Sequence, residues 1–318
     1  MDLTQTQEYE LLATISARGE IPVKFIYLNE GAAKWDTYYR KTEQGGRDTL
    51  EEDRLMSSHI DSFMQSFHDA SGFNLIDLGC GNGLPAVKIM ERLAGKGFSI
   101  HYVPVDISQT MLALAAKNIK KQFPDISVTE MQVDFENESL TSKLLGMKQT
   151  SRQPNLLINL GGTLGNYVNV GAVLTNFLQS MTLEDYLIVG NGLVNDQNPQ
   201  KILSNYIGKE SVKYEDTRVA RKLGLFNDQD DYKVLWNAAQ HRVEGRIKLN
   251  EDKQLHLAGQ SVTMEKDDEI LILQSCKYTE VSLTKLLSNV GFRTELLTTN
   301  RSRSYVLAMI QPTRYSAS

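Results

Sequence analysis

The sequence predicts an α/β protein with a doubly wound parallel sheet and a second, smaller α+β domain. Three observations predict this fold class. The middle of the chain alternates short apolar runs with segments whose apolar residues have helical spacing. Such alternation is typical of parallel strands joined by crossover helices. The first apolar run breaks into glycines before a helix, and the alternation stops near residue 195.

The composition is that of a globular protein with one or two domains. The chain has 318 residues, a formal net charge of −5 and 41% hydrophobic residues. Because domains commonly contain about 100–200 residues, the chain can form one large core or two smaller ones. The acidic balance argues against nucleic acid or an anionic membrane as a partner.

Export, membrane insertion and metal binding are not expected. No apolar run approaches the roughly 20 residues of a membrane span, and the N-terminus lacks the profile of a signal peptide. Cys80 and Cys276 are the only cysteines, and neither they nor the five histidines have metal-ligand spacing. We therefore expect a cytoplasmic protein without a metal.

The first half of the chain contains the expected parallel strands. "FNLIDLG" (73–79) reads as a strand, and the apolar residues of 86–93 recur at i, i+3, i+4 and i+7, as on one helix face. "SIHYVPVD" (99–106) is a second strand, in which Pro104 implies a bulge because proline lacks a ladder donor. Ser108 is expected to cap the following helix.

Three further strands follow in the same rhythm. "ISVTEMQVD" (126–134) alternates, and "PNLLINLGG" (154–162) is a continuous apolar run, as in a strand buried on both faces. A helical stripe over 174–181 precedes the strand "DYLIVGNGLV" (185–194). These segments complete the predicted sheet apart from its last strands.

A segment of about 80 residues is expected to be inserted between the fifth strand and the last helix, because the pattern changes near residue 195 and returns later. Residues 195–200 form a turn-rich break, a polar helical stretch continues to Lys222, and 241–249 and 261–273 look like antiparallel strands. The earlier pattern then returns with a helix closed by Gly291 and two strands, 292–299 and 304–310.

The glycine loop after the first strand predicts a ligand at the carboxyl edge of the sheet. Glycine allows its amides to approach a ligand closely and adopts positive φ. Gly79, Gly81 and Gly83 have the spacing G-x-G-x-G. A dinucleotide fingerprint would have G-x-G-x-x-G, so the loop departs from the pyrophosphate motif. Pro85 suits the first turn of the helix that follows.

Acidic residues at the next two strand ends favour an adenosyl ligand. Asp106 ends the second strand, where a carboxylate can accept hydrogen bonds from ribose hydroxyls. Asp134 and Phe135 follow the third strand and suit the amine and the ring of an adenine. Taken alone, the glycine loop could be only a turn between a strand and a helix, and Asp106 could be a helix-start residue. Asp134 could likewise be a turn residue and Phe135 a core residue. Their joint position at one sheet edge favours S-adenosylmethionine.

At this point the sequence resembles a known family. "YVPVDISQTMLALAA", "VDFEN", "NLGGTLGNY" and "SCKYT" together resemble the amino-acid N-methyltransferases typified by the histidine Nα-methyltransferase of ergothioneine biosynthesis. The resemblance covers about 22–310 and is strongest over 74–196. It implies a Rossmann-like class I methyltransferase core, expected over 61–195 plus 277–318. It also implies a substrate-binding domain, expected over 1–60 plus 196–276.

The resemblance also implies roles for individual residues. It places Gly79, Asp106, Asp134 and Phe135 on the cofactor, with Gly161 and Gly162 lining its methionine side. It places Asn166 on the acceptor's amine or carboxylate and Tyr206 on the carboxylate, with Tyr39 as a further acceptor contact and Tyr38 as its alternative. Tyr206 could instead anchor a surface helix, Tyr39 could be structural, and Asn166 could be only a turn residue.

Two positions depart from the family. Leu273 stands where the histidine enzymes carry a glutamate that pairs with the imidazole, whereas Ser275 of the same motif is kept. Burying an imidazole N–H without a partner costs about 1–3 kcal/mol, so histidine is not the expected substrate. Pro85 stands where the family can carry a lysine near the cofactor.

The sequence therefore predicts an S-adenosylmethionine-dependent N-methyltransferase of secondary metabolism. The expected acceptor is the amine of a free amino acid or a related small molecule, with Tyr39 and Asn166 at the reaction centre. One alternative is O- or N-methylation of another small metabolite, since function follows the pocket and not the scaffold. Another is a non-catalytic protein that binds S-adenosylmethionine. We expect a monomer whose partner is a small molecule.

Overall fold

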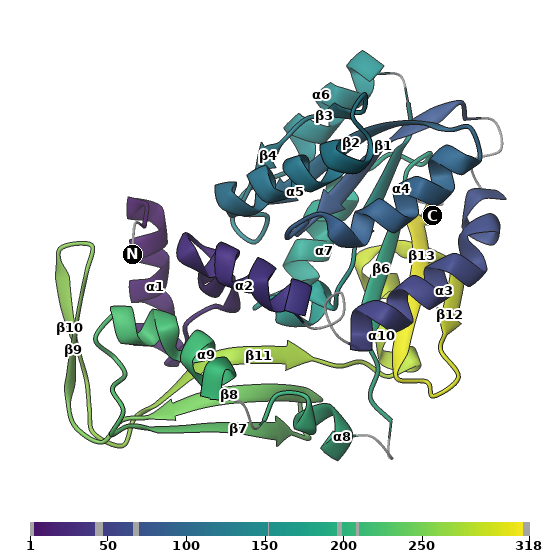
Figure 1. The fold of residues 1–318 in the computed structure, drawn as a ribbon. Coiled ribbons are helices and arrows are strands. Elements are labelled where there is room, and N and C mark those ends of the chain that lie inside the picture. The colour runs from purple at the N-terminus through teal and green to yellow at the C-terminus, as the bar shows by residue number, and fades with distance from the viewer. Residues whose placement is uncertain are drawn as a thin grey trace, which may run out of the picture. The chain divides into compact units, whose positions relative to one another are not determined.

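The structure is a computed structural model, and it describes two compact units of the chain (Figure 1). The described residues are 3–41, 47–65, 70–151, 153–195, 199–207 and 210–313. The first unit contains Met1–Gly31 and Val194–Lys277, and the second contains Ala32–Leu193 and Tyr278–Ser318. For convenience we call them the insertion unit and the sheet unit.

The sheet unit is built on a mixed sheet with the strand order β12-β13-β6-β5-β1-β2-β3, and β4 also pairs with β2. Pairing is parallel from β6 to β3 and β4, whereas β13 is antiparallel to β6 and β12 is antiparallel to β13. The strands are β1 (Gly72–Leu78), β2 (Ser99–Asp106), β3 (Ser127–Val128), β4 (Met131–Gln132), β5 (Asn155–Asn159), β6 (Tyr186–Gly192), β12 (Phe292–Thr299) and β13 (Tyr305–Pro312). The predicted doubly wound α/β sheet is confirmed.

Helices cover both faces of this sheet (Figure 1). Successive strand residues point to opposite faces, so Leu75 lies in a core with α3, α4 and α5, whereas Ile76 lies in a core with α6, α7 and α10. The helices are α3 (Arg47–Met64), α4 (Leu84–Gly95), α5 (Gln109–Gln122), α6 (Thr141–Ser151), α7 (Val170–Gln179) and α10 (Glu280–Val290). Ser108 caps α5 by accepting a hydrogen bond from the Met111 N–H, as predicted.

The predicted bulge at Pro104 is wrong. The parallel register of β1 and β2 runs without a shift from Gly72–Ser99 to Leu78–Val105. On its other side, β2 pairs with β3 through Tyr102 and with β4 from Val105 onward. The missing N–H of Pro104 falls in the gap between these two short strands, which replace the single predicted strand.

The insertion unit contains a three-stranded antiparallel sheet, β11-β8-β7, and a separate β9–β10 hairpin. The strands are β7 (Asp231–Asn237), β8 (Arg242–Lys248), β9 (Lys253–Leu257), β10 (Gln260–Met264) and β11 (Glu269–Cys276). The helices are α1 (Gln5–Arg18), η1 (Val23–Tyr27), α8 (Pro199–Ser204) and α9 (Glu210–Lys222). Glu20 bridges to Leu271, so the N-terminal segment adds to the edge of this sheet.

The boundaries of the two units differ from the expected domain boundaries mainly near the N-terminus. The sheet unit begins at Ala32, whereas the expected core began at residue 61. The reason is α3, whose Met56 and Phe63 are buried in the core of the sheet unit and whose contacts include β13. The α2 helix (Glu30–Lys41) runs through the boundary. The boundary after Leu193 and the boundary after Lys277 each lie within two residues of the expected positions.

Asp77 is a buried acid within β1. Its carboxylate accepts a 2.7 Å hydrogen bond from the Tyr102 hydroxyl, and its side chain is buried in the sheet unit. Burial raises the pKa of Asp77 to about 7, while the hydrogen bond from Tyr102 acts in the opposite direction. The folded protein therefore retains a proton on Asp77 at pH values where the unfolded chain has lost it.

This difference predicts how stability changes with pH. Between about pH 4 and pH 7 the unfolded state binds fewer protons at this position than the folded state, so the contribution of Asp77 to the free energy of unfolding decreases as pH rises. We expect Asp77→Asn to flatten this dependence in urea unfolding measured from pH 4.5 to 7.5. Asp125→Asn, at an exposed acid, is the control. Equal slopes for Asp77→Asn and the wild type would contradict the expectation.

Candidate functional site

The glycine loop lies at the carboxyl ends of the central parallel strands. The Gly79 N–H donates to the Val105 carbonyl at 2.8 Å, so the loop is fixed to the end of β2. Gly81 has φ +52°, and a Cβ at this position would lie 3.0 Å from the Trp35 ring. Gly83 has φ +71°, and a Cβ there would lie 3.0 Å from Ala115. Both positions require glycine because of backbone conformation and close packing.

Asp106 joins this loop to the start of α5. Its carboxylate accepts hydrogen bonds from the Gly81 N–H at 3.2 Å and from the Ser108 N–H at 2.9 Å. The side chain is buried, and burial raises the pKa of Asp106 to about 6, although these backbone hydrogen bonds lower it. Above this pH the carboxylate is charged, and its geometry holds the glycine loop beside the end of β2.

Asp134 and Phe135 follow β4 at the same edge of the sheet. The Asp134 carboxylate accepts from the Glu136 N–H at 3.2 Å and from the Asn137 amide at 2.9 Å, so it stabilises a turn. Phe135 packs edge-on against two other aromatic rings, with centroid distances of 5.6 Å to Tyr167 and 5.4 Å to Phe177. In this structure Asp134 is therefore a turn residue and Phe135 packs among core aromatic residues. Phe135 also approaches the glycine loop, because a Cβ on Gly79 would lie 3.9 Å from it.

Gly161, Gly162 and Asn166 lie at the end of β5. Both glycines have positive φ, +71° and +74°, and Gly162 precedes the short helix η3 (Thr163–Asn166). An ideal Cβ on Gly161 meets no atom within 4 Å, so there is open space beside this residue. Because β1 pairs with both β2 and β5 in parallel, Gly79, Asp106 and Gly161 lie at one edge of the sheet.

Glu52 of α3 is a buried acid that was not singled out from the sequence. Its Oε2 atom accepts a 2.8 Å hydrogen bond from the Gly161 N–H and also accepts from the Tyr305 hydroxyl. Only 3% of the residue is exposed. Glu52 therefore connects α3 to the glycine pair after β5 and to β13. It is a positioning residue for the loop that contains Gly161.

Removing the Glu52 carboxylate is expected to destabilise this loop. Glu52→Ala leaves two donors without their acceptor, and each unsatisfied buried donor costs about 1–3 kcal/mol. Glu52→Gln keeps one acceptor oxygen, so it should lose less stability. Thermal unfolding of both variants, with Glu184→Ala as an exposed control, measures the effect. Equal stability of Glu52→Ala and the wild type would show that Glu52 does not support the loop.

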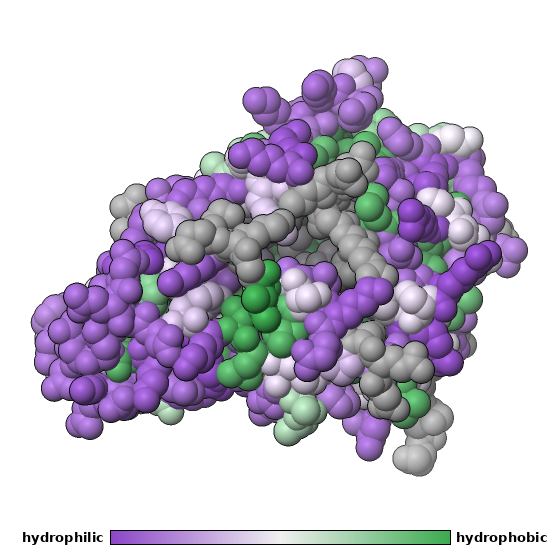
Figure 2. Space-filling view, turned by 60° about the horizontal axis from the view of Figure 1, so that its bottom comes forward, coloured by the Kyte–Doolittle hydropathy of each residue, from purple (hydrophilic) through white to green (hydrophobic). Residues whose placement is uncertain are grey.

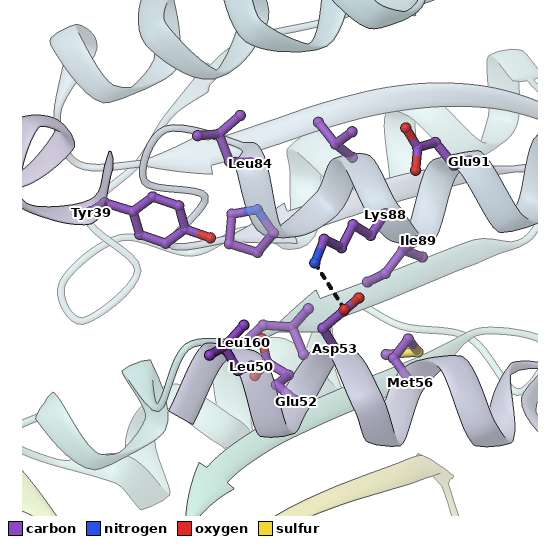
Figure 3. Close-up of a pocket in the computed structure, with 12 residues that line it drawn as sticks. Tyr39, Leu50, Glu52, Asp53, Met56, Leu84, Lys88, Ile89, Glu91 and Leu160 are labelled. Carbon is purple, nitrogen blue, oxygen red and sulfur yellow. Dashed lines mark hydrogen bonds and ion pairs between the residues drawn. The ribbon is translucent and has the colours of Figure 1, made fainter. Parts of the chain in front are cut away.

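A cavity of about 220 Å³ adjoins both glycine loops within the sheet unit. Its wall includes Leu160, directly before Gly161, and residues at the start of α4 and in the first half of α3 (Figure 3). Its polar groups are Glu52, Glu91, the Tyr39 hydroxyl and the ion pair between Lys88 and Asp53, which are 2.8 Å apart. Strand order reverses at this point of the sheet, between β1 and β5, where ligands of doubly wound folds bind.

Tyr39 is buried in this wall and packs 5.2 Å from Trp35, measured between ring centroids, whereas Tyr38 is 48% exposed. Burial raises the pKa of Tyr39, and the nearby charges of Glu52 and Asp53 raise it further. The hydroxyl therefore stays protonated near neutral pH. It can donate a hydrogen bond but does not provide a phenolate base.

Tyr206, Ser275 and Leu273 lie together in the insertion unit. Tyr206 follows α8, and its hydroxyl donates to the Ser275 Oγ atom at 3.0 Å. Leu273 and Ser275 are alternate residues of β11, so both side chains are on one face of that strand. Leu273 pairs with Gly245 of β8, next to a shift in the register of the two strands.

Gly245 allows a close approach over Leu273. A Cβ at residue 245 would lie 2.8 Å from the Leu273 Cβ atom and 2.9 Å from the Tyr232 hydroxyl. That hydroxyl donates to the Asp216 Oδ2 atom of α9 at 2.6 Å. Burial raises the pKa of Asp216 to about 6. Leu273 and the hydrogen-bonded Tyr232–Asp216 pair therefore both lie close to Gly245.

The comparison with known proteins identifies the family. A family model described as "Histidine-specific methyltransferase, SAM-dependent" matches residues 7–312. The chain belongs to this family. It is therefore a methyltransferase that depends on S-adenosylmethionine.

Several curated relatives of this methyltransferase match most of its length. It is 24% identical to the histidine N-alpha-methyltransferase of Mycobacterium tuberculosis, over 85% of this chain and 84% of the relative. It is 22% identical to the 4-dimethylallyltryptophan N-methyltransferase of Claviceps fusiformis, over 90% of this chain and 86% of the relative. It is 21% identical to an N-methyltransferase of Aspergillus flavus, over 93% of this chain and 82% of the relative.

The described part of this methyltransferase contains neither a helix that could cross a membrane nor a cluster of side chains that could hold a metal ion. None of its described helices is long and apolar enough to cross a membrane, and the face in Figure 2 is largely hydrophilic. Among the described residues, no group of three or more His, Cys, Asp or Glu side chains could hold a metal ion.

Proposed function

We propose that this methyltransferase methylates the α-amine of a free amino acid other than histidine. The observation that carries the proposal is the face of β11, where Ser275, hydrogen-bonded to Tyr206, lies beside the apolar side chain of Leu273. The first two groups suit the polar end of an amino acid, and the third suits an apolar side chain. Two relatives are named for N-methylation of amino acids or their derivatives, which supports the same substrate class.

The carboxyl edge of the sheet fits the adenosyl cofactor. Gly79, Gly81 and Gly83 allow close approach, and the buried Asp106 carboxylate can accept from ribose hydroxyls. The Asp134–Phe135 pair is proposed for the adenine, provided that Asp134 shares its turn hydrogen bonds. Gly161, which has open space beside it, and Gly162 are proposed for the methionine end.

The sheet unit is proposed to bind the cofactor and the insertion unit to contribute acceptor contacts. Tyr206, Ser275 and Leu273 are the proposed contacts from the insertion unit, and Tyr39 and Asn166 are those from the sheet unit. A histidine side chain would place its imidazole N–H against an apolar group at Leu273. That arrangement leaves a donor without a partner and disfavours histidine.

The protein's own residues would accelerate the reaction mainly by orientation. When bound, the cofactor supplies a methyl group on a sulfonium, which an amine lone pair can attack in line. Fixing such reactants in line can contribute about 7–11 kcal/mol. Water would accept the proton that the substrate's ammonium group must lose before its nitrogen can attack, and Asn166 and the protonated Tyr39 hydroxyl would orient the resulting neutral amine.

Methyl transfer from labelled S-adenosylmethionine across free amino acids, phenols and simple amines tests the proposal. The expected result is turnover of one or more amino acids, with weak or no turnover of histidine. Turnover restricted to phenols, carboxylates or amines unrelated to amino acids would favour the alternative small metabolite. Cofactor binding by calorimetry without turnover of any acceptor would favour a non-catalytic binding protein.

A further inference from the structure

Asp216 of α9 is an acid of the insertion unit without a basic partner among the described residues. Its side chain is partly buried, and its Oδ2 atom accepts a 2.6 Å hydrogen bond from the Tyr232 hydroxyl. In the described part of the chain no other group donates to this carboxylate, and no Lys, Arg or His side chain forms an ion pair with it. The neighbouring charge that acts on it, Glu215, is also acidic.

Two other acids of the same unit show the usual arrangement. Glu244 is buried, and its Oε2 atom accepts a 2.7 Å hydrogen bond from Arg246. Asp230 is also buried, and its carboxylate lies 3.6 Å from the Lys253 Nζ atom. Taking a carboxylate out of water is costly unless a cation or several donors compensate it. Asp216 has one neutral donor, so a cationic ligand would supply the compensation that the other two acids receive from the chain.

Tyr232 brings this acid close to the proposed acceptor contacts. A Cβ at residue 245 would lie within 3.0 Å of both the Tyr232 hydroxyl and the Leu273 Cβ atom, so these two groups are neighbours above Gly245. Gly245 pairs with Leu273, which shares its face of β11 with Ser275. Tyr232 and Leu273 are partly buried, so each keeps some accessible surface on this side of the sheet.

The order of these groups predicts the chemistry of the acceptor's side chain. Alternate residues of a strand are about 7 Å apart, so Leu273 lies one such step from Ser275. An acceptor whose polar end lies at Ser275 therefore directs an apolar stem along Leu273, and the end of a long side chain meets the Tyr232 hydroxyl. Burial and the nearby Asp216 carboxylate raise the pKa of Tyr232, so its hydroxyl donates to Asp216 and can still accept from an N–H group.

We propose that Asp216 is a specificity-determining residue that binds a cationic nitrogen group at the end of the acceptor's side chain. The proposal rests on the proposed amino-acid methylation and deepens it, because it names the acceptor class as basic amino acids with a long apolar stem. Ammonium and guanidinium groups are the complementary ligands for a carboxylate with unused acceptor positions. The ring nitrogens of histidine lie closer to its backbone, so they end beside Leu273 instead.

The first test uses the wild-type enzyme and pairs of acceptors that differ in side-chain charge. Arginine is compared with citrulline, and lysine with hydroxynorleucine, at about pH 8, where Asp216 is charged because burial raises its pKa only to about 6. In at least one pair the cationic acceptor should have a kcat/KM about 10- to 100-fold above its neutral isostere, with the methyl group on the α-amine. Absence of this preference in both pairs would overturn the proposal and leave amino-acid methylation standing.

The second test assigns the preference to Asp216. Asp216→Asn should bring the ratio of cationic to neutral kcat/KM close to one. Tyr232→Phe removes the same hydrogen bond but keeps the carboxylate, so it should retain most of the preference. Asp231→Asn is the matched control, because Asp231 is an exposed acid of β7 whose side chain is on the opposite face from Tyr232. The control should keep the wild-type ratio.

A purely structural role for the pair gives a different result. Asp216→Asn and Tyr232→Phe would then destabilise the contact between α9 and β7 alike, and both would lower turnover of cationic and neutral acceptors by the same factor. Thermal unfolding and S-adenosylhomocysteine binding by calorimetry show whether each variant is folded. Equal effects of the two substitutions on both acceptors would overturn the role of Asp216 in specificity.

The remaining failures are distinguishable. If the wild-type enzyme methylates no amino acid, the proposed function itself is wrong. If it prefers cationic acceptors and a folded Asp216→Asn variant keeps that preference, another residue binds the cation. If Asp216→Asn does not fold, Asp216→Glu decides: its longer side chain should shift the preference from lysine toward the shorter ornithine, and an unchanged order would overturn the proposal.

Discussion

Asp106→Ala is expected to weaken binding of S-adenosylmethionine by about 10- to 100-fold, the effect of losing hydrogen bonds to a charged group. Two effects contribute. The variant loses the proposed acceptor for the ribose hydroxyls, and it loses the carboxylate that holds the Gly81 and Ser108 N–H groups. Isothermal titration with S-adenosylhomocysteine measures the affinity. Asp125→Ala, at an exposed acid, is the control.

The pH dependence of the affinity gives a second reading on Asp106. Since burial raises the pKa of Asp106 to about 6, the carboxylate becomes protonated as pH falls through this value. Wild-type affinity should therefore be steady above about pH 7 and should decrease below pH 6, and Asp106→Asn should remove this dependence. If Asp106→Ala folds and binds S-adenosylhomocysteine as tightly as the wild type, Asp106 is not a cofactor ligand.

Leu273→Glu is expected to raise kcat/KM for histidine by about 10- to 100-fold. The substituted carboxylate would give the imidazole N–H an acceptor, and satisfying a buried donor is worth about 1–3 kcal/mol. Turnover of acceptors with apolar side chains should fall in the same variant, because a charged group replaces the apolar Leu273 side chain beside Gly245. Labelled methyl transfer to histidine and to the best apolar amino acid measures both effects.

Leu235→Glu is the matched control for this substitution. Leu235 is 37% exposed and belongs to β7, where it pairs with Glu244 and so faces away from Gly245. The Leu235→Glu variant should methylate histidine and the best apolar amino acid at the same rates as the wild type. If Leu273→Glu leaves the ratio of histidine to apolar turnover unchanged, the side chain at residue 273 does not contact the acceptor.

Much of the fold could be predicted because its signals are local. The continuous apolar run of β5 and the helical stripe of α7 follow from periodicity, and the caps at Ser108 and Gly291 follow from residue chemistry. The gap beside Pro104 could not be predicted, because it depends on how two other strands pair with β2. The start of the sheet unit at Ala32 depends on where α3 packs, which no local pattern reveals.

The candidate site likewise contains some residues that the sequence could predict and others that it could not. The glycine loop and Asp106 carry signals in their own spacing, and their hydrogen bond places them together. Glu52 carries none, because its partner Gly161 is 109 residues away. Ser275 belongs to the quoted "SCKYT" segment, but its contact with Tyr206 depends on the fold of the segment between β6 and β11. Long-range side-chain pairs therefore required the structure.

A crystal structure of the protein with S-adenosylhomocysteine tests most directly where the cofactor binds. We predict that the ribose hydroxyls lie within hydrogen-bond distance of the Asp106 carboxylate, with the adenine beside Phe135 and the amino-acid end near Gly161. A nucleoside bound away from the Gly79–Gly83 loop, with Asp106 contacting only backbone N–H groups, would contradict the proposed site.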